Sequence, residues 1–242
     1  MAKDDTRKGS MSIVLTGSVV QCYRNLERTG LQDPGERLTD YLCAISRWLK
    51  QPEIDHVLYC DAGPFLIPEE IFDNKKLESM RIDLRSVAYQ LGKGPAESKT
   101  LEHVMNSSTR LRENFFKCTG RLFVKNFTEI VRKINFDAKL MAISMNQDYR
   151  WADTRFFWLD RAHYRNVIHP NADLCDDYQK CHIERLYHYF LWQYQDLPPP
   201  VVVGRFGHTG ELYDEDYSPE EKENARNLIN RHGLLRGKYH AL

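Results

Sequence analysis

Short apolar runs alternate along this chain with stretches in which apolar residues recur every three to four positions. Runs of the first kind are typical of buried strands, and the second pattern predicts helices with one buried face. The predicted strands are 12–17, 54–61, 80–89, 115–118, 138–144, 151–160 and 201–203. A strand–helix–strand order implies parallel pairing with right-handed crossovers. We therefore predict an α/β fold with a mostly parallel central sheet flanked by helices.

The periodic stretches set the predicted bounds of the helices. Helices are expected at 36–50, 96–107, 127–134 and 178–194, and a further one begins near Pro219. The clearest is 178–194, whose buried stripe consists of Ile183, Leu186, Tyr187, Phe190, Leu191 and Tyr194. A single domain over 11–242 follows, preceded by a polar tail at 1–10 that we expect to be disordered.

The composition narrows the class of protein. The chain has 242 residues, of which 42% are hydrophobic, enough for one sizeable core. Lysine plus arginine number 34 and aspartate plus glutamate number 34, so the net charge is zero with neutral histidines. A nucleic-acid binder should carry a cationic surplus, and we therefore expect no nucleic-acid partner.

The sequence also bears on the compartment. Residues 1–10 lack the apolar core of a secretory signal, and no run approaches the ~18 apolar residues of a membrane span. The six cysteines are scattered and read as reduced thiols. We expect a cytoplasmic protein, and the basic end at 231–238 suggests weak contact with the inner face of a membrane.

The most informative turn lies within 115–126. An apolar run breaks at Thr119-Gly120 and then restarts, with Lys117 before the break and Arg121 after it. A buried strand that enters a tight glycine turn presents such groups at its carboxyl end, where open α/β sheets bind ligands. Arginine pairs with phosphate oxygens in a bidentate fork, and lysine adds a point charge. We predict that these four residues bind a phosphate or diphosphate; the alternative is a strand with a solvated basic turn.

The ends of two other predicted strands and the start of a predicted helix lie at the same ligand-binding edge of the sheet, which we call the rim. Thr16 and Gly17 close the first predicted strand, and Asp61 closes the second. For Asp61 the alternative is a cap or turn residue. Lys93 and Gly94 precede the helix at 96–107, whose first N–H groups can hold an anion together with the lysine. We place all five residues with the phosphate-binding turn.

A second group of polar residues fits a sugar acceptor. Asp153 and Arg155 lie two apart, so they share one face of an extended chain, and Phe156 follows them. His182 and Glu184 flank the buried stripe of the helix at 178–194. The alternatives are a surface ion pair for the first two residues and exposed helix surface for the last two.

The loop at 204–213 carries His208 among three glycines, which lets the backbone approach a ligand closely. The acidic triplet Asp214-Glu215-Asp216 follows it. Its spacing resembles a divalent-metal motif, but acids also favour helix starts, and here they precede the helix near Pro219.

Taken in order, these motifs resemble a group of bacterial glycosyltransferases of capsule and lipopolysaccharide synthesis. The resemblance covers residues 11 to about 217. It rests on Leu15-Thr16-Gly17, the turn at Asp61, Gly92-Lys93-Gly94 with Glu97, Phe116-Lys117 with Thr119-Gly120-Arg121-Leu122-Phe123 and Asn126, Asp153 with Arg155-Phe156-Phe157, Ile183-Glu184, and Gly207 with Thr209-Gly210 and Tyr213.

The resemblance implies a GT-A-like domain that transfers a sugar from a nucleotide-sugar donor to a glycan or lipid-linked glycan. The candidate bases that would deprotonate the acceptor are Asp153, Glu184 and His208, in that order. Arg155, Phe156 and His182 would bind the acceptor. Two other classes remain open: a nucleotide-binding or scaffolding protein with a degenerate transferase fold, and a nucleotidyl- or phosphosugar transferase with the same basic rim.

Two departures from the group bear on the mechanism. The group often has Glu-Asn-Ser where this chain has Asp61-Ala62-Gly63, and the Asp-x-Asp metal motif of GT-A enzymes is absent from the central strand. Cations stand at that strand instead, and they can neutralise a leaving diphosphate. We therefore expect a metal-independent reaction without a cofactor. A requirement for manganese or magnesium would move the metal site to Asp153 or to the triplet at 214–216.

Overall fold

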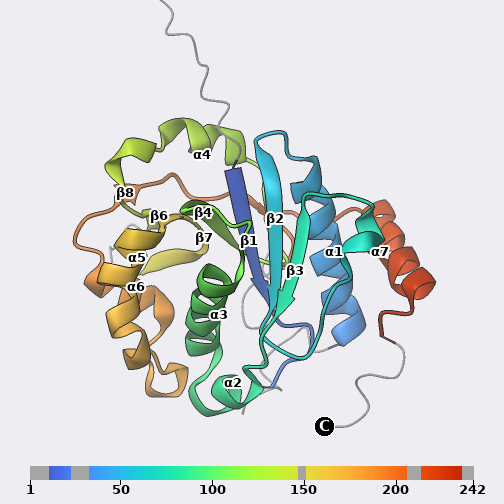
Figure 1. Ribbon diagram of the computed structural model, residues 1–242, viewed down its shortest axis with the longest axis horizontal. Helices are drawn as coiled ribbons and strands as arrows, with labels where there is room; N and C mark the ends of the chain where they lie inside the picture. Colours follow the sequence, from blue (N-terminus) through green and yellow to red (C-terminus); the bar gives the residue numbers. More distant parts are fainter. Residues whose placement is uncertain (1–10, 23–32, 147–150, 206–213, 236–242) are drawn as a thin grey trace, which may run out of the picture.

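A seven-stranded sheet forms the centre of the computed structural model, which describes residues 11–22, 33–146, 151–205 and 214–235 (Figure 1). The strand order is β3-β2-β1-β4-β7-β6-β8. The strands are β1 (Met11–Gly17), β2 (Ile54–Asp61), β3 (Leu77–Arg81), β4 (Asn114–Thr119), β6 (Ala142–Met145), β7 (Ala152–Asp160) and β8 (Gln195–Asp196). The predicted last strand is β9 (Val202–Val203), which pairs with β5 (Phe123–Val124) in a separate two-stranded sheet.

The strand directions confirm a mostly parallel sheet. β1 is parallel to both β2 and β4, β2 to β3, and β6 to β8, whereas β7 is antiparallel to β4 and β6. We call the end of the sheet at Gly17, Asp61 and Thr119 the carboxyl edge. Because β7 runs opposite to β4, the start of β7 also lies at the carboxyl edge. This direction was not predicted, and it brings Asp153 to the same edge as Thr119.

Helices cover both faces of the sheet. They are α1 (Pro34–Lys50), α2 (Arg85–Leu91), α3 (Lys93–Ser107), α4 (Phe127–Lys133), α5 (Arg161–Val167), α6 (Ile183–Phe190) and α7 (Pro219–His232). Side chains of α1, α4 and α7 share one apolar cluster with the sheet, and those of α3, α5 and α6 share another. Figure 1 shows α1 and α7 together at the right. No helix in the described part of the chain is long and apolar enough to cross a membrane.

Local signals explain where two helices begin. Asp33 caps α1 by accepting from the Glu36 N–H at 2.7 Å, and Pro34 occupies a position where no hydrogen bond is lost. Ser218 and Glu221 form a reciprocal capping box on α7. The cap of α7 is therefore Ser218 and not the acidic triplet before it.

Three sequence predictions need correction. The predicted strand 80–89 is in fact the end of β3 followed by α2, because so short an apolar segment fits either periodicity. The predicted helix 178–194 is only α6, since a 3₁₀ helix at Asp177–Gln179 precedes it. Lys93 and Gly94 were predicted to precede the helix at 96–107, but α3 begins at Lys93 and includes both residues.

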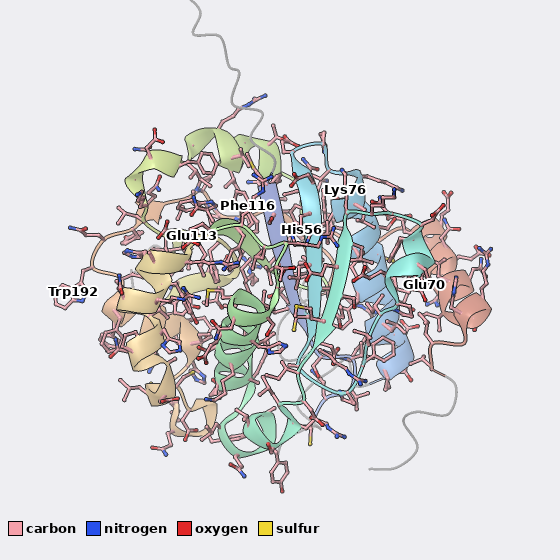
Figure 2. The ribbon with its side chains drawn as sticks, in the orientation of Figure 1. His56, Glu70, Lys76, Glu113, Phe116 and Trp192 are labelled. Atoms are coloured by element: carbon pink, nitrogen blue, oxygen red, sulfur yellow. The ribbon has the colours of Figure 1, made fainter. Side chains whose placement is uncertain are left out.

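Aromatic rings fill the core between β4, β7 and α4. Phe116 stacks on Phe156 with ring centres 5.5 Å apart, and both contact Phe127 edge-on. Figure 2 shows Phe116 inside the molecule, whereas Trp192, just after α6, projects from its surface with 87% exposure. This dense layer packs β4 and β7 tightly against α4.

Candidate functional site

Two Thr-Gly pairs end β1 and β4 side by side at the carboxyl edge. Thr16 lies opposite Thr119 in the parallel ladder, and the Gly120 N–H donates to the Thr16 carbonyl at 2.7 Å. A Cβ on Gly17 would lie 2.5 Å from the Tyr41 ring, and one on Gly120 would lie 2.9 Å from the Thr16 carbonyl oxygen and 3.0 Å from the same ring. The close approach of Tyr41 therefore requires glycine at 17, and the Thr16 carbonyl together with that ring requires it at 120; sequence analysis did not foresee the part of Tyr41.

Arg121 directly follows this turn and is the most informative side chain of the edge. It is only 6% exposed, and within the described residues its Nε and Nη1 atoms have no hydrogen-bond acceptor. Its backbone carbonyl accepts from the Tyr217 hydroxyl at 2.9 Å, which fixes the turn. A buried guanidinium that lacks acceptors is costly. A bound anion would supply the missing acceptors.

Two further arginines surround Arg121. Arg37 donates from Nε to the Ser18 carbonyl at 2.9 Å and from Nη2 to the Tyr41 hydroxyl at 3.1 Å. Arg205 pairs with buried Asp40 and also reaches Glu36. Burial lowers the pKa of Arg121 and so does the like charge of Arg37, whereas Tyr41 and Asp40 raise it. Arg121 thus lies among cations and a carboxylate, and it is the acceptors missing at its Nε and Nη1 atoms that favour an anionic ligand.

Asp61 is fully buried, and its carboxylate serves the fold. Oδ2 accepts from the Val19 N–H at 2.9 Å and from the Tyr59 hydroxyl at 2.8 Å, and Oδ1 accepts from the Gly63 N–H at 2.8 Å. Burial raises the pKa of Asp61 to about 6 despite these bonds. Asp61 thus makes the contacts of a turn residue, which was the predicted alternative. Its carboxylate does not reach the surface, so it acts on a donor site only by holding the segment at Val19.

The start of α3 already holds an anion, which is the carboxylate of Asp177. Its Oδ2 accepts from the Gly94 N–H at 2.9 Å, and Oδ1 lies 3.2 Å from His182 Nδ1. A Cβ on Gly92, whose φ is 105°, would lie 2.4 Å from the Asp177 Cβ. The two glycines of the Gly-Lys-Gly motif thus make room for Asp177. Of Lys93 and Gly94, which were both predicted to bind the donor, only Lys93 is exposed.

Lys117 does not lie on the rim, which corrects its predicted exposure to a phosphate. Its side chain is fully buried and forms an ion pair with Glu97 of α3. Nζ also donates to the Thr154 carbonyl at 2.5 Å and lies 5.4 Å from the centre of the Phe157 ring. Lys117 therefore links β4 to α3 and β7. Thr119 is half-buried and remains at the edge.

The predicted acceptor side gathers at the start of β7 and the start of α6. Arg155 donates to both carboxylate oxygens of Asp153, at 2.9 and 2.7 Å, and both side chains are partly exposed. The Glu184 carboxylate accepts from the Thr154 hydroxyl at 3.2 Å. Both candidate bases thus lie near the start of β7, but on opposite faces of it, because the Thr154 side chain that contacts Glu184 points away from the face shared by Asp153 and Arg155.

An aromatic ring that sequence analysis did not assign packs against the start of α6. Trp151 is half-buried, stacks on His182 at 5.7 Å, and has the Arg185 guanidinium 4.7 Å from its centre. The predicted acceptor contact of Phe156 is corrected, because that ring is 1% exposed and lies in the core. His208 lies outside the described residues.

The acidic triplet after the His208 loop is engaged with the protein's own donors. Asp214 accepts from the Val202 N–H at 3.0 Å, Glu215 pairs with Lys125, and Asp216 accepts from Lys222 at 2.5 Å. Among the residues that the structure describes, no three His, Cys, Asp or Glu side chains group as ligands for a metal ion.

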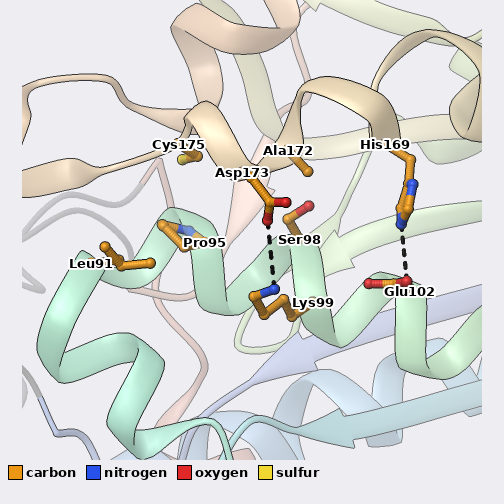
Figure 3. Close-up of a pocket in the computed structure, with 9 residues that line it drawn as sticks. All are labelled: Leu91, Pro95, Ser98, Lys99, Glu102, His169, Ala172, Asp173 and Cys175. Atoms are coloured by element: carbon orange, nitrogen blue, oxygen red, sulfur yellow. Dashed lines mark ion pairs between the residues drawn. The ribbon is translucent and has the colours of Figure 1, made fainter.

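A separate cavity of about 230 Å³ lies between α3 and the 3₁₀ helix His169–Leu174 (Figure 3). Two ion pairs cross it: Lys99 to Asp173 at 3.7 Å and His169 to Glu102 at 2.9 Å. None of the predicted site residues lines this cavity. The candidate site therefore stays at the carboxyl edge.

Comparisons with known proteins give only distant structural likeness. No described protein family and no curated protein matches the sequence. An active-site mutant of LgtC superposes with a TM-score of 0.49 at 9% identity, over 77% of this chain and 72% of that chain. Galactosyltransferase LgtC in complex with donor and acceptor sugar analogues gives 0.47 at 10% identity, over 74% and 70%. A 4-diphosphocytidyl-2C-methyl-D-erythritol synthase from Anaerococcus prevotii gives 0.39 at 10% identity, over 93% and 100%.

Proposed function

We propose that this protein is a GT-A-like glycosyltransferase that moves a sugar from a nucleotide-sugar donor to a glycan or lipid-linked glycan. The resemblance of its motifs suggests bacterial capsule or lipopolysaccharide synthesis, which would place the reaction at the cytoplasmic face of a membrane. The proposal rests on the residues of the carboxyl edge, where the sheet ends in two Thr-Gly turns flanked by arginines.

One observation carries the proposal: the buried, unpaired guanidinium of Arg121 at the carboxyl end of β4. Among the described residues, neither Nε nor Nη1 has an acceptor. A diphosphate carries several acceptor oxygens, so separate oxygens can accept from Nε and from Nη1, which point in different directions from the guanidinium. Binding of the donor would therefore satisfy a group that costs free energy in the empty protein.

The same charges suit the chemistry of transfer. Negative charge builds on the diphosphate as the glycosidic bond to it breaks, and fixed cations stabilise that charge without having to reorganise. We propose that Arg121, with Arg37 beside it, supplies this stabilisation and that the reaction needs no metal ion.

On the acceptor side, we propose Asp153 as the general base. It lies at the start of β7, two residues after Trp151 and paired with Arg155, and a carboxylate there can take the proton of the attacking hydroxyl. Glu184, held by the Thr154 hydroxyl at 3.2 Å, is the second candidate. The half-buried Trp151 replaces Phe156 as the ring that an acceptor sugar would contact.

A panel of UDP-, GDP- and CMP-sugars tests the function. We expect one donor to bind and to be hydrolysed slowly in the absence of an acceptor, with release of the nucleotide. Binding of a nucleoside triphosphate with release of pyrophosphate would instead identify a nucleotidyltransferase. If no nucleotide binds, the scaffolding alternative holds and the proposal is wrong.

A further inference from the structure

We infer that the buried Glu97–Lys117 ion pair is a positioning device for the acceptor side of the site. It holds the backbone of β7 at Thr154 and through it the carboxylates of Asp153 and Glu184. Neither Glu97 nor Lys117 contacts a substrate in this account. The inference rests on the proposed transferase function, because it assigns the two carboxylates to catalysis.

The hydrogen bonds form one continuous chain through four elements. Glu97 of α3 pairs with Lys117 of β4, and the ammonium donates to the Thr154 carbonyl of β7 at 2.5 Å. The hydroxyl of the same threonine donates to Glu184 of α6 at 3.2 Å. Thr154 is thus fixed through both its backbone and its side chain.

The place of these hydrogen bonds in the sheet explains how they position the start of β7. The ladder between β4 and β7 ends at the pair Cys118–Phe156. The stretch of β7 that carries Asp153 and Thr154 therefore lies beyond the residue pairs of this ladder, and on its other side Ala152 pairs with Met145 of β6. The Lys117 ammonium supplies a side-chain link between β4 and β7 at that point.

The cost of burying the pair argues for such a role. Lys117 is fully buried and Glu97 nearly so, with 9% of its side chain exposed. Desolvation of two charges can exceed their attraction, and apolar residues of similar volume are often as stabilising or more so. Stability alone therefore does not explain an ion pair here. Orientation of Thr154 does, since a displacement of about 1 Å near a reacting group can lower the rate by roughly 100-fold.

The test is a double substitution, Glu97→Leu with Lys117→Met, which removes both charges and leaves neither partner buried alone. We expect a melting temperature that is unchanged or higher and an unchanged Kd for the donor. We expect kcat to fall between about tenfold and 100-fold. The matched control is His56→Leu with Glu78→Leu, because this buried pair, with a 2.8 Å contact, lies toward the opposite edge of the sheet. The control should leave kcat unchanged in protein that remains folded.

A second readout does not depend on turnover. We expect the ¹³C shifts of the Thr154 carbonyl and of the Asp153 and Glu184 carboxyl carbons to move in the double variant and to stay in the control. If the wild type binds and hydrolyses none of the UDP-, GDP- and CMP-sugars, the transferase function is overturned, while the NMR signals still report on positioning. A double variant with unchanged NMR signals, or with normal kcat, would overturn the inference. A loss of stability alone would reduce the pair to a structural role.

Discussion

Arg205 donates two hydrogen bonds of 2.9 Å to Asp40, from Nε to Oδ2 and from Nη2 to Oδ1. The same guanidinium reaches Glu36, so Arg205 is bound by two carboxylates. Nearby Arg121 has no such partner among the described residues at its Nε and Nη1 atoms. The two arginines thus differ in whether carboxylates already hold the guanidinium.

The first prediction concerns the pair of Arg205 and Asp40. Asp40→Asn should lower the free energy of unfolding by about 3 kcal/mol, because Asp40 is fully buried and its loss leaves Arg205 without its bidentate partner. Urea denaturation measures this change. The matched control is Asp83→Asn, which removes an exposed bidentate pair with Arg85 and should cost less than about 1 kcal/mol. Equal costs at the two sites would contradict this assignment.

The second prediction concerns pH. The pKa of Asp61 is raised by burial to about 6 in the folded protein, whereas an unfolded aspartate titrates near ~3.9. Between these values the folded state holds a proton that the unfolded state has lost, so this contribution to stability is present below about pH 4 and is lost as the pH rises through about 6. Asp61→Asn cannot titrate and should lack this dependence.

The measurement for Asp61 is the difference in unfolding free energy between the wild type and Asp61→Asn. From pH 4 to pH 7 the wild type should lose about 2 kcal/mol relative to the variant. The variant carries a constant offset, because one of the three donors at this site then faces an amide NH₂. A difference that stays constant with pH would show that Asp61 titrates normally.

The third prediction is that donor turnover survives EDTA. The cations at the carboxyl edge, Arg37 and Arg121, stabilise the leaving diphosphate in our account. Loss of activity with chelator and its return with manganese or magnesium would contradict the proposed mechanism. In that case Asp153 would be the first metal ligand to test.

The fourth prediction concerns the base. Asp153→Asn keeps the shape and one of the two bonds from Arg155 but removes the basicity, so the transfer rate should fall by roughly 100-fold or more with little change in donor affinity. Asp83→Asn is the control, because Arg85 holds Asp83 at 2.8 and 2.7 Å in the same two-residue arrangement. A near-normal transfer rate in Asp153→Asn would give the role to Glu184 or His208.

The sequence predicted the parts of the fold that depend on local periodicity. The apolar runs located β1, β2 and β4, and the helical period located α1. The break at Thr119-Gly120 correctly marked the end of β4. The prediction of a strand at 80–89 was wrong, because α2 is only seven residues long and has too few turns for a helical period to show in the sequence.

The rest depends on contacts between residues far apart in the chain. The antiparallel direction of β7 follows from its pairing with β4, which no local pattern encodes. The burial of Lys117 follows from Glu97, twenty positions earlier. The Gly94 N–H was predicted to bind an anionic ligand, but it donates to Asp177, which is 83 positions away. The sequence shows that Lys117 and Asp177 carry charges, but only the fold shows that each of them already has a partner within the protein.

The most direct measurement of the central claim is donor binding and thermal stability of Arg121→Met, side by side. We predict that the Kd for the nucleotide sugar rises at least about tenfold to 100-fold, since a buried charge that contacts the ligand is lost. The melting temperature should stay the same or rise, because the variant no longer buries an unpaired guanidinium. Lys125→Met, an exposed cation paired with Glu215, should leave the Kd unchanged. An Arg121→Met protein with lowered stability and unchanged donor affinity would contradict the account.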